Sequence, residues 1–209
     1  PTESITFSHL CHIGQYILSI VMAKDDGFYE FCGSSLIFDQ DKLLNNSWPE
    51  FTPCFQNTLI VWVPCGMLWL MLPFYLVYMF TYVSNISIPV NRLNVSKTCV
   101  SIVLCLLSII DIVKTIAEGQ SDSVPGVVYL AGGLKACTYL LTAVLIQLER
   151  LKGVFTSAVL WMFWLLTTIG NVIPFYTKIY IEDYNDNFFH FVVFYIYYAF
   201  VVLQFLLSC

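Results

Sequence analysis

Charged side chains are scarce in this sequence. Asp, Glu, Lys and Arg make up 11% of its 209 residues, against about 25% in ordinary soluble domains. That scarcity excludes a water-soluble enzyme domain. Cations are the rarer sign, because 9 Lys and Arg stand against 14 Asp and Glu, for a formal net charge of −5. Nucleic acid is therefore excluded as a partner, since binding phosphates requires a basic surface.

Motifs for catalysis are missing as well. The sequence contains no G-x-x-x-x-G-K-[ST] loop to hold a nucleotide phosphate and no H-E-x-x-H pair to bind zinc. Its three histidines do not combine with Ser and Asp into a nucleophilic set. We therefore predict no catalytic residues, no metal site and no cofactor in this segment.

Apolar residues, in contrast, are abundant: 58% of the chain is hydrophobic, 17% is aromatic, and the mean hydropathy is +0.76. A helix crosses a bilayer with about 20 apolar residues, and a charge at its centre costs about 2.5 to 3.5 kcal/mol. Runs that are poor in charge therefore mark the spans. We predict five of them, at about 55–78, 98–117, 127–147, 154–176 and 188–209. The predicted fold class is an all-α integral membrane bundle of five transmembrane helices.

Two features of these spans bear on their packing. Pro64 and Pro73 lie in the first span, and each removes a backbone hydrogen bond, so this helix should be kinked. Gly132 and Ala136 are four residues apart in the third span, and small residues at that spacing permit close contact with another helix.

The orientation of the bundle follows from the cations in its short loops, because cytoplasmic loops are enriched in Lys and Arg. Five spans place the two ends of the domain on opposite sides of the membrane. With the N-terminus outside, the inner loops carry four cations: Arg92, Lys97, Arg150 and Lys152. The outer side carries Lys178, and Lys114 at the end of the second span. We therefore predict that the N-terminus is outside and the C-terminus is cytoplasmic.

Glycosylation sequons provide a check on this orientation. Asn45 begins a sequon in the segment predicted to lie outside, so we predict a glycan there. Asn85 and Asn94 also begin sequons, but both fall in the first inner loop. A glycan on either of these two residues would contradict the orientation.

The chain divides into three parts on this reading. Residues 1–21 look like a translated upstream stretch, because Met22 opens a plausible start (MAKDDGFYEFCG). Residues 22–54 form an extracellular N-terminal segment, and residues 55–209 form the five-span membrane domain. The prediction of a start at Met22 implies that purified protein yields no peptides from residues 1–21.

Cys32 and Cys54 differ from the cysteines inside the spans, because both lie in the polar segment before the first span. The predicted topology places that segment in an oxidising exterior, where disulfides persist. A disulfide that closes the segment is the favoured prediction. Two free thiols are the alternative.

Charges inside the spans suggest an interhelical pair. Asp111 in the second span and Lys135 in the third lie at nearly equal depth below the outer ends of two helices joined by a short loop. An Asp111–Lys135 pair would lower the cost of burying both charges. Lys114 lies one turn from Asp111 and could take the partner role instead. A pair that fixes helix register is the favoured interpretation, and a substrate or ion pathway is the alternative.

Several stretches of the chain, spread over about residues 29–209, resemble the N-terminal membrane domain of the multidrug-resistance-associated proteins, which belong to subfamily C of the ABC transporters. They are Phe31-Cys32-Gly33, FTPCFQNT at 51–58, VWVPC at 61–65, LNVSKT at 93–98, IQLERLKGV at 146–154, FYIY at 194–197 and LSC at 207–209. Lys135 and residues 1–21 depart from the family pattern.

The resemblance implies a five-span accessory domain with its N-terminus outside, which precedes two six-span transport domains and two nucleotide-binding domains. It implies that Cys32 and Cys54 are bridged. The full-length protein would export organic anions, including glutathione, glucuronide and sulfate conjugates, with ATP and magnesium as cofactors. Its transport and nucleotide sites lie in domains absent from this chain, so the substrate-binding residues are unknown. This domain would serve trafficking, membrane retention or partner contacts.

Two alternative functions remain open. One is the similar domain of a sulfonylurea-receptor-like subunit, which regulates a channel; co-purification with a potassium channel pore would favour it. The other is a stand-alone five-span scaffolding protein. The exporter interpretation predicts a multi-pass protein of the plasma membrane or of a vacuolar or lysosomal membrane, whose partners are the lipid bilayer, the remaining transporter domains and trafficking proteins.

Overall fold

The computed structural model describes residues 31–32, 52–83, 89, 91–118, 125–154, 157–180 and 188–209. Over these residues the chain is helical. The elements are α4 (Pro53–Phe55), the π-helix η1 (Gln56–Ile60), α5 (Val61–Tyr82), α6 (Arg92–Glu118), α7 (Gly126–Leu151), α8 (Ala158–Tyr180) and α9 (Phe188–Ser208). Five of the helices are long and apolar enough to cross a membrane, as predicted, with η1 and α5 forming the first of them.

The observed helices differ from the predicted spans mainly at the end that carries Arg92 and Arg150. There α5 continues to Tyr82 instead of 78, α6 begins at Arg92 instead of 98, and α7 ends at Leu151 instead of 147. The absence of charge marks the hydrocarbon core, about 30 Å thick. A helix of 27 residues is about 40 Å long, so α6 extends beyond that core into the polar zone, where charges are tolerated.

The start of α8 is set by a cap that the prediction overlooked. We expected the fourth span to begin at 154, but α8 begins at Ala158. Ser157 precedes it, and the Ser157 hydroxyl oxygen accepts a hydrogen bond of 3.2 Å from the backbone N–H of Leu160. This is the N-cap geometry, which satisfies a backbone donor that the helix itself leaves unpaired.

The C-terminus of α7 is closed by a Schellman turn. Gly153 adopts a left-handed conformation with φ 78°, which costs glycine little because it has no Cβ. The Val154 N–H donates to the Glu149 carbonyl at 2.9 Å, and the Gly153 N–H donates to the Arg150 carbonyl at 3.2 Å. These two bonds occupy carbonyls at the end of the helix and turn the chain toward α8.

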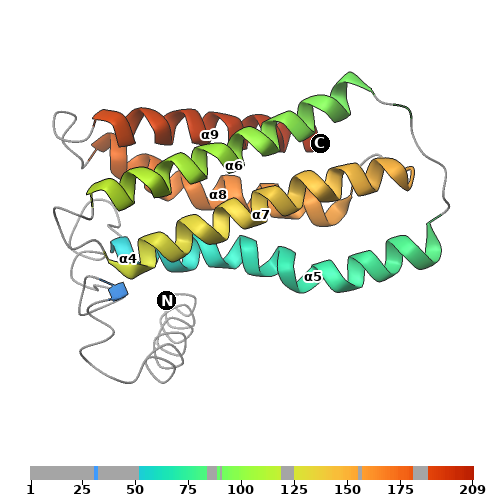
Figure 1. Cartoon of the computed structure of the whole chain (residues 1–209), viewed down its shortest axis with the longest axis horizontal. Coiled ribbons are helices and arrows are strands. Elements are labelled where there is room, and N and C mark those ends of the chain that lie inside the picture. Colours follow the sequence, from blue (N-terminus) through green and yellow to red (C-terminus); the bar gives the residue numbers. More distant parts are fainter. Residues whose placement is uncertain are drawn as a thin grey trace, which may run out of the picture.

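Proline shapes the first span in two places. Pro64 has no N–H to donate to the Ile60 carbonyl, and the π-helix η1 ends at this same residue, Ile60. A π-type turn is a common adjustment where the regular pattern of hydrogen bonds is interrupted. Pro73 lies further along α5, and the ribbon of α5 bends part-way along its length (Figure 1). The kink predicted from the two prolines is present.

The five long helices close into a ring. The main packed pairs are α5 with α7, α7 with α6, α6 with α9, α9 with α8, and α8 with α5. Each helix therefore has two principal neighbours, and the helices lie side by side along the long axis of the molecule (Figure 1). Side chains of all five helices meet in one buried hydrophobic cluster, which fills the interior of the ring.

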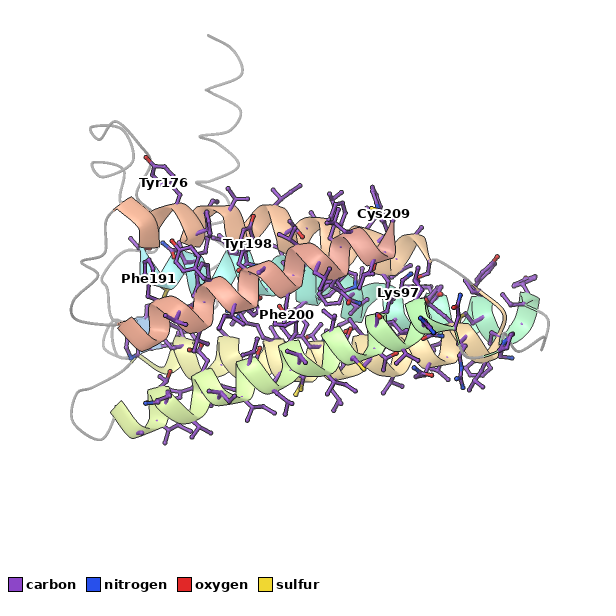
Figure 2. The ribbon with its side chains drawn as sticks, turned by 90° about the horizontal axis from the view of Figure 1, so that it is seen from above. Lys97, Tyr176, Phe191, Tyr198, Phe200 and Cys209 are labelled. Atoms are coloured by element: carbon purple, nitrogen blue, oxygen red, sulfur yellow. A yellow bond between two sulfur atoms is a disulfide. The ribbon has the colours of Figure 1, made fainter. Side chains whose placement is uncertain are left out.

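The two ends of the ring have different character, and we name them by it. The disulfide end is the end where α7 and α9 begin and where Cys54 precedes the first span. The basic end is the opposite one, where α6 begins at Arg92 and α7 ends near Arg150 and Lys152. Figure 2 shows Lys97 and Cys209 toward the basic end, and Phe191 and Tyr176 at the other.

Gly132 of α7 packs closely against Ile112 of α6. A Cβ atom built at Gly132 would lie 2.5 Å from Cγ1 of Ile112, whereas a Cβ at the adjacent Gly133 would meet nothing within 4 Å. The close helix contact predicted at Gly132 is therefore present.

We expect Gly132→Ala to destabilise the bundle by about 1 to 3 kcal/mol, the usual cost of overpacking a well-packed core. The measurement is thermal unfolding of the protein in mild detergent. Gly133→Ala is the matched control and should leave the melting temperature unchanged or slightly raised, because alanine favours the helix. Equal melting temperatures for the two variants would contradict the close approach.

Candidate functional site

A disulfide joins Cys32 to Cys54, with the two Cα atoms 5.1 Å apart and a sequence separation of 22 residues. These are the two cysteines paired in the sequence analysis. Both are buried, and the aromatic rings of Phe31 and Phe55 pack against them. The Phe31 ring also lies against the start of α7, 3.4 Å from the position that a Cβ at Gly126 would take. The covalent bond therefore holds Phe31 and Cys32 beside the start of the first span and the start of α7.

Below the disulfide end, each of the five long helices contributes one polar side chain at a similar depth. We call this set of side chains the outer polar layer. Its members are Cys65, Asp111, Lys135, Asn171 and Tyr197. Cys65 lies nine residues from Gln56, where η1 begins, and Lys135, Asn171 and Tyr197 lie nine residues from an end of α7, α8 and α9, which is about 14 Å at 1.5 Å per residue. Asp111 lies seven residues from the end of α6. Sequence positions far apart are thus brought to one level.

Contacts inside the outer polar layer cross the ring. The Lys135 ammonium lies 5.7 Å from the centroid of the Tyr197 ring and within electrostatic range of Cys65. Asp111 and the Asn171 amide are both within electrostatic range of Tyr197. Because α7 and α9 are not a main packed pair, Lys135 reaches Tyr197 through the interior of the ring.

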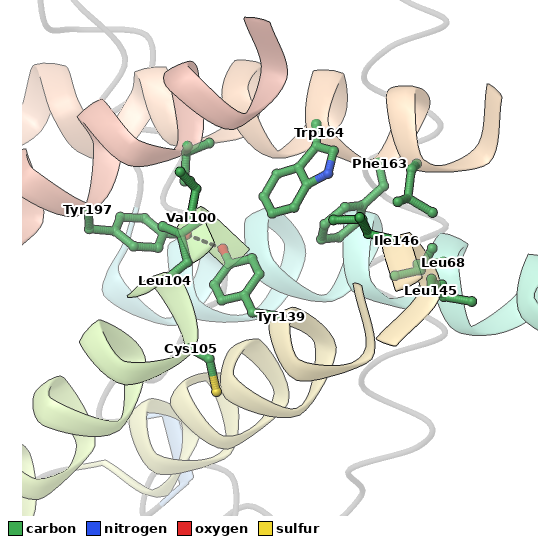
Figure 3. Close-up of a cluster of buried hydrophobic side chains, with 12 residues drawn as sticks. Leu68, Val100, Leu104, Cys105, Tyr139, Leu145, Ile146, Phe163, Trp164 and Tyr197 are labelled. Carbon is green, nitrogen blue, oxygen red and sulfur yellow. Dashed lines mark hydrogen bonds between the residues drawn. The ribbon is translucent and has the colours of Figure 1, made fainter. Parts of the chain in front are cut away.

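An aromatic layer fills the ring below the outer polar layer (Figure 3). The hydroxyls of Tyr139 and Tyr197 hydrogen bond to each other across the ring. Trp164 stacks on Tyr139, with ring centroids 5.8 Å apart and planes 7° apart. Phe163 meets Trp164 edge-on at 4.9 Å. With Leu104 fully buried among them, these side chains leave the middle of the bundle densely filled.

A second set of polar side chains lies toward the basic end, and we call it the inner polar layer. Its centre is Glu149 of α7, only 6% exposed. The Glu149 carboxylate accepts a hydrogen bond of 2.9 Å from the Tyr75 hydroxyl and lies within electrostatic range of the Ser157 hydroxyl and the Lys97 ammonium. Lys97 is itself 8% exposed. This one carboxylate therefore connects α5, α6 and α7 with the start of α8.

Amide side chains extend the inner polar layer to α9. The Gln204 amide nitrogen donates to the Ser101 hydroxyl at 3.2 Å, and both residues are fully buried. The Gln147 amide nitrogen donates to the Thr98 hydroxyl at 2.6 Å. Lys97 also lies within electrostatic range of Cys209, and the two are near the same end of the bundle in Figure 2. Interhelical bonds of this kind hold membrane helices together where the hydrophobic effect cannot.

The residues singled out from the sequence are placed as follows. Asp111 and Lys135 belong to the same layer and both approach Tyr197, and their pairing with each other stays a prediction. Lys114 lies exposed on α6, three residues beyond Asp111. Asn45, residues 1–21 and most of residues 22–54 lie outside the described residues, so the glycan and these divisions of the chain stay predictions.

The central position of Glu149 was not predicted from the sequence. Only the cations beside it, Arg150 and Lys152, were used, as indicators of a cytoplasmic loop. A signal was present, because Glu149 and Lys97 are charges of opposite sign that both lie at the basic end of predicted spans. Tyr75 and Ser157 as its partners could be found only from the structure.

The chemistry of these layers is that of helix association. Within the described ranges, no three His, Cys, Asp or Glu side chains gather as they would to hold a metal ion. The polar groups instead satisfy one another between helices, which is expected of polar residues that face the inside of a membrane bundle. The site is therefore the ring interior, two polar layers separated by an aromatic one.

Comparison with known proteins identifies a matching family and several relatives of this chain. The family model of the "ABC transporter TMD0 domain" matches residues 40–193. The ATP-binding cassette sub-family C member 3 proteins of Rattus norvegicus and Homo sapiens are 38% and 34% identical to the chain over 186 residues. The sub-family C member 2 protein of Mus musculus is 28% identical over 182 residues. These alignments cover 85% or 86% of the chain but 12% of each relative, so the chain spans about an eighth of their length.

Proposed function

The chain belongs to the ABC transporter TMD0 family, and from this premise we propose that it is the N-terminal accessory membrane domain of an ATP-driven exporter of organic anions. The match to the family model over residues 40–193 carries the proposal. Its relatives among the sub-family C members 3 and 2 support the same class of protein. We propose glutathione, glucuronide and sulfate conjugates as the transported substrates.

The part that this domain plays in the exporter is trafficking, membrane retention or contact with partners. Its buried polar groups are engaged in holding five helices together, and its sequence carries no phosphate-binding loop. ATP and magnesium are therefore assigned to the remaining domains of the full-length protein. The partners of this chain are the lipid bilayer, those remaining domains and trafficking proteins.

We propose that the disulfide end faces the outside and the basic end faces the cytoplasm. A disulfide persists in an oxidising compartment, which supports placing the Cys32–Cys54 bond outside. Arg92, Arg150 and Lys152 gather at the opposite end, which supports a cytoplasmic location there by the cation rule. The two arguments use different residues and agree. The protein is a multi-pass membrane protein, and the plasma membrane or a vacuolar or lysosomal membrane is the proposed location.

The exporter is favoured over a channel-regulating subunit by the identity of 34% to 38% with the sub-family C member 3 proteins. A stand-alone scaffolding protein is less favoured, because the relatives continue far beyond the matched region.

Transport by the full-length protein tests the proposal. Inside-out vesicles that contain it should take up a labelled glutathione conjugate when ATP is supplied, and should not do so with AMP in its place. Deletion of the residues of this domain should lower the amount of exporter at its membrane, measured by surface biotinylation, while uptake per delivered molecule is retained. Failure to transport glutathione, glucuronide and sulfate conjugates alike would overturn the exporter assignment.

A further inference from the structure

The basic end is positively charged, although the whole chain has a net charge of −5. Residues 76–98, 147–160 and 203–209 of the sequence contain one carboxylate, Glu149, and four cations. The cations are Arg92, Lys97, Arg150 and Lys152. Glu149 is buried, accepts a hydrogen bond from the Tyr75 hydroxyl and lies within electrostatic range of the Lys97 ammonium. The carboxylate of this end is therefore used inside the bundle, and the surface of the end is cationic.

Helix packing brings three of these cations to one level, and we call Arg92, Arg150 and Lys152 the basic surface. Arg92 is exposed, and the other two are part-exposed. α6 and α7 pack side by side in opposite directions, and Gln147 of α7 bonds with Thr98 of α6. Arg92 lies about 9 Å beyond Thr98, and Lys152 lies about 8 Å beyond Gln147, toward the same end. The start of α6 and the end of α7 are therefore level with each other.

Aromatic residues at the end of α5 indicate the depth of the basic surface in the membrane. Tyr78, Phe80 and Tyr82 are 55%, 61% and 77% exposed. The Lys152 ammonium lies 4.8 Å from the centroid of the Phe80 ring, so the basic surface is beside these rings. Exposed tyrosines at the end of a membrane helix are typical of the level of the lipid headgroups. The basic surface is therefore placed to meet headgroups.

The Arg150 guanidinium lacks an acceptor within the chain. Its Nε atom is buried and makes no hydrogen bond to any residue that the structure describes. The side chain as a whole is only part-buried, so other parts of it reach the surface. A guanidinium pairs well with the oxygens of a phosphate, since its donors match their geometry. An anionic group from outside the chain can therefore pair with Arg150.

We propose that the basic surface binds the headgroup of an anionic phospholipid in the leaflet at the basic end. Arg150 and Lys152 pair with its phosphate, Arg92 adds to the positive potential that attracts it, and the exposed rings of α5 contact its chains. Zwitterionic lipids are disfavoured, because their own cation is repelled. The inference rests on the proposed contact with the bilayer and deepens it by naming the class of lipid. It does not depend on the transport of conjugates.

The experiment measures lipid binding to the full chain in mild detergent by native mass spectrometry, with phosphatidylserine or phosphatidylcholine added at matched concentrations. Both lipids contain a phosphate, but only phosphatidylserine has a net negative charge. We therefore expect the native chain to bind phosphatidylserine several-fold more tightly. A higher salt concentration should remove most of this preference, because salt screens charges at a surface. That measurement needs no substitution.

Single substitutions assign the preference to the basic surface. Arg150→Gln and Lys152→Gln each remove one cation from it, and Lys114→Gln is the matched control, because Lys114 is an exposed cation near the opposite end of α6. A cation at a membrane surface contributes about 1 kcal/mol to the attraction of anionic lipid, which is about fivefold in Kd. We expect Arg150→Gln or Lys152→Gln to weaken phosphatidylserine binding about fivefold. Lys114→Gln should leave it unchanged, and Arg150→Lys should retain most of it.

Other occupants of the basic surface give different results. Equal binding of the two lipids, or equal weakening in Lys114→Gln and Arg150→Gln, would overturn the proposal. Competition by soluble glycerophosphoserine at the concentrations at which the lipid binds would show a site for free phosphate esters and would also overturn it. The preference should persist in the full-length protein, and its loss there would show that the remaining domains cover the surface. Conjugate transport without a lipid preference would remove this inference and leave the exporter assignment intact.

Discussion

Replacing Glu149 by alanine should destabilise the bundle by about 3 to 5 kcal/mol, the range for breaking a buried charged pair from one side. The carboxylate is 6% exposed, and its loss leaves the Tyr75 hydroxyl without its acceptor and the Lys97 ammonium buried without a compensating charge. The measurement is the melting temperature in mild detergent, together with the fraction of protein recovered as a single monodisperse species.

Two further variants separate the charge from the hydrogen bond. Glu149→Gln keeps an oxygen that can accept a hydrogen bond from Tyr75 but removes the charge. Its melting temperature should therefore lie between those of the native protein and Glu149→Ala. The double variant Lys97→Met, Glu149→Leu removes both charges and should recover much of the stability, because an apolar pair of similar volume is often neutral. A double variant that is less stable than Glu149→Ala would show that Lys97 and Glu149 do not act as a pair.

Removal of the disulfide has the second largest expected effect. Cys32 and Cys54 close a loop with a sequence separation of 22, and the loop-entropy model assigns such a closure about 3 kcal/mol. Cys32→Ala together with Cys54→Ala should therefore release the segment before the first span. Native-state hydrogen exchange should become faster near Phe31 and in the first turns of the first span, and the melting temperature in detergent should fall.

Chemical reduction tests the same disulfide independently. Dithiothreitol should lower the melting temperature of the native protein to that of the double alanine variant and leave the variant itself unchanged. Cys137→Ser is the matched control, because Cys137 is exposed and free and should contribute little. Two alkylatable thiols at positions 32 and 54 in unreduced protein would contradict the bond.

Fold class and helix number could be predicted because they depend on a composition rule that acts locally. A charge is costly in hydrocarbon wherever it falls along the chain, so charge-free runs mark the spans without knowledge of their neighbours. The helix ends could not be predicted by that rule. Arg92 and Arg150 lie inside α6 and α7, because a helix continues into water until a cap such as Ser157 or a turn such as that at Gly153 ends it.

The candidate site was predicted only in part, for a related reason. Asp111 and Lys135 stand out in the sequence because they are charges surrounded by apolar residues. Tyr139, Tyr197 and Trp164 do not stand out, since the chain has many aromatic residues and lipid-facing ones look the same. What distinguishes the three is their position in the ring, which follows from the pairing of helices, and a single sequence holds little information about that pairing.

The pairing of helices has a consequence for the order in which the domain assembles. The helix synthesised directly after α5 is α6, which is not one of the main partners of α5. Those partners are α7 and α8. The first span therefore meets its first main partner, α7, only after α6 has entered, and its second, α8, only after α7. The hairpins that can form during synthesis are α6 with α7 and α8 with α9. The bent, proline-containing α5 can complete its contacts only once α8 has entered, because it packs against α7 of one hairpin and α8 of the other.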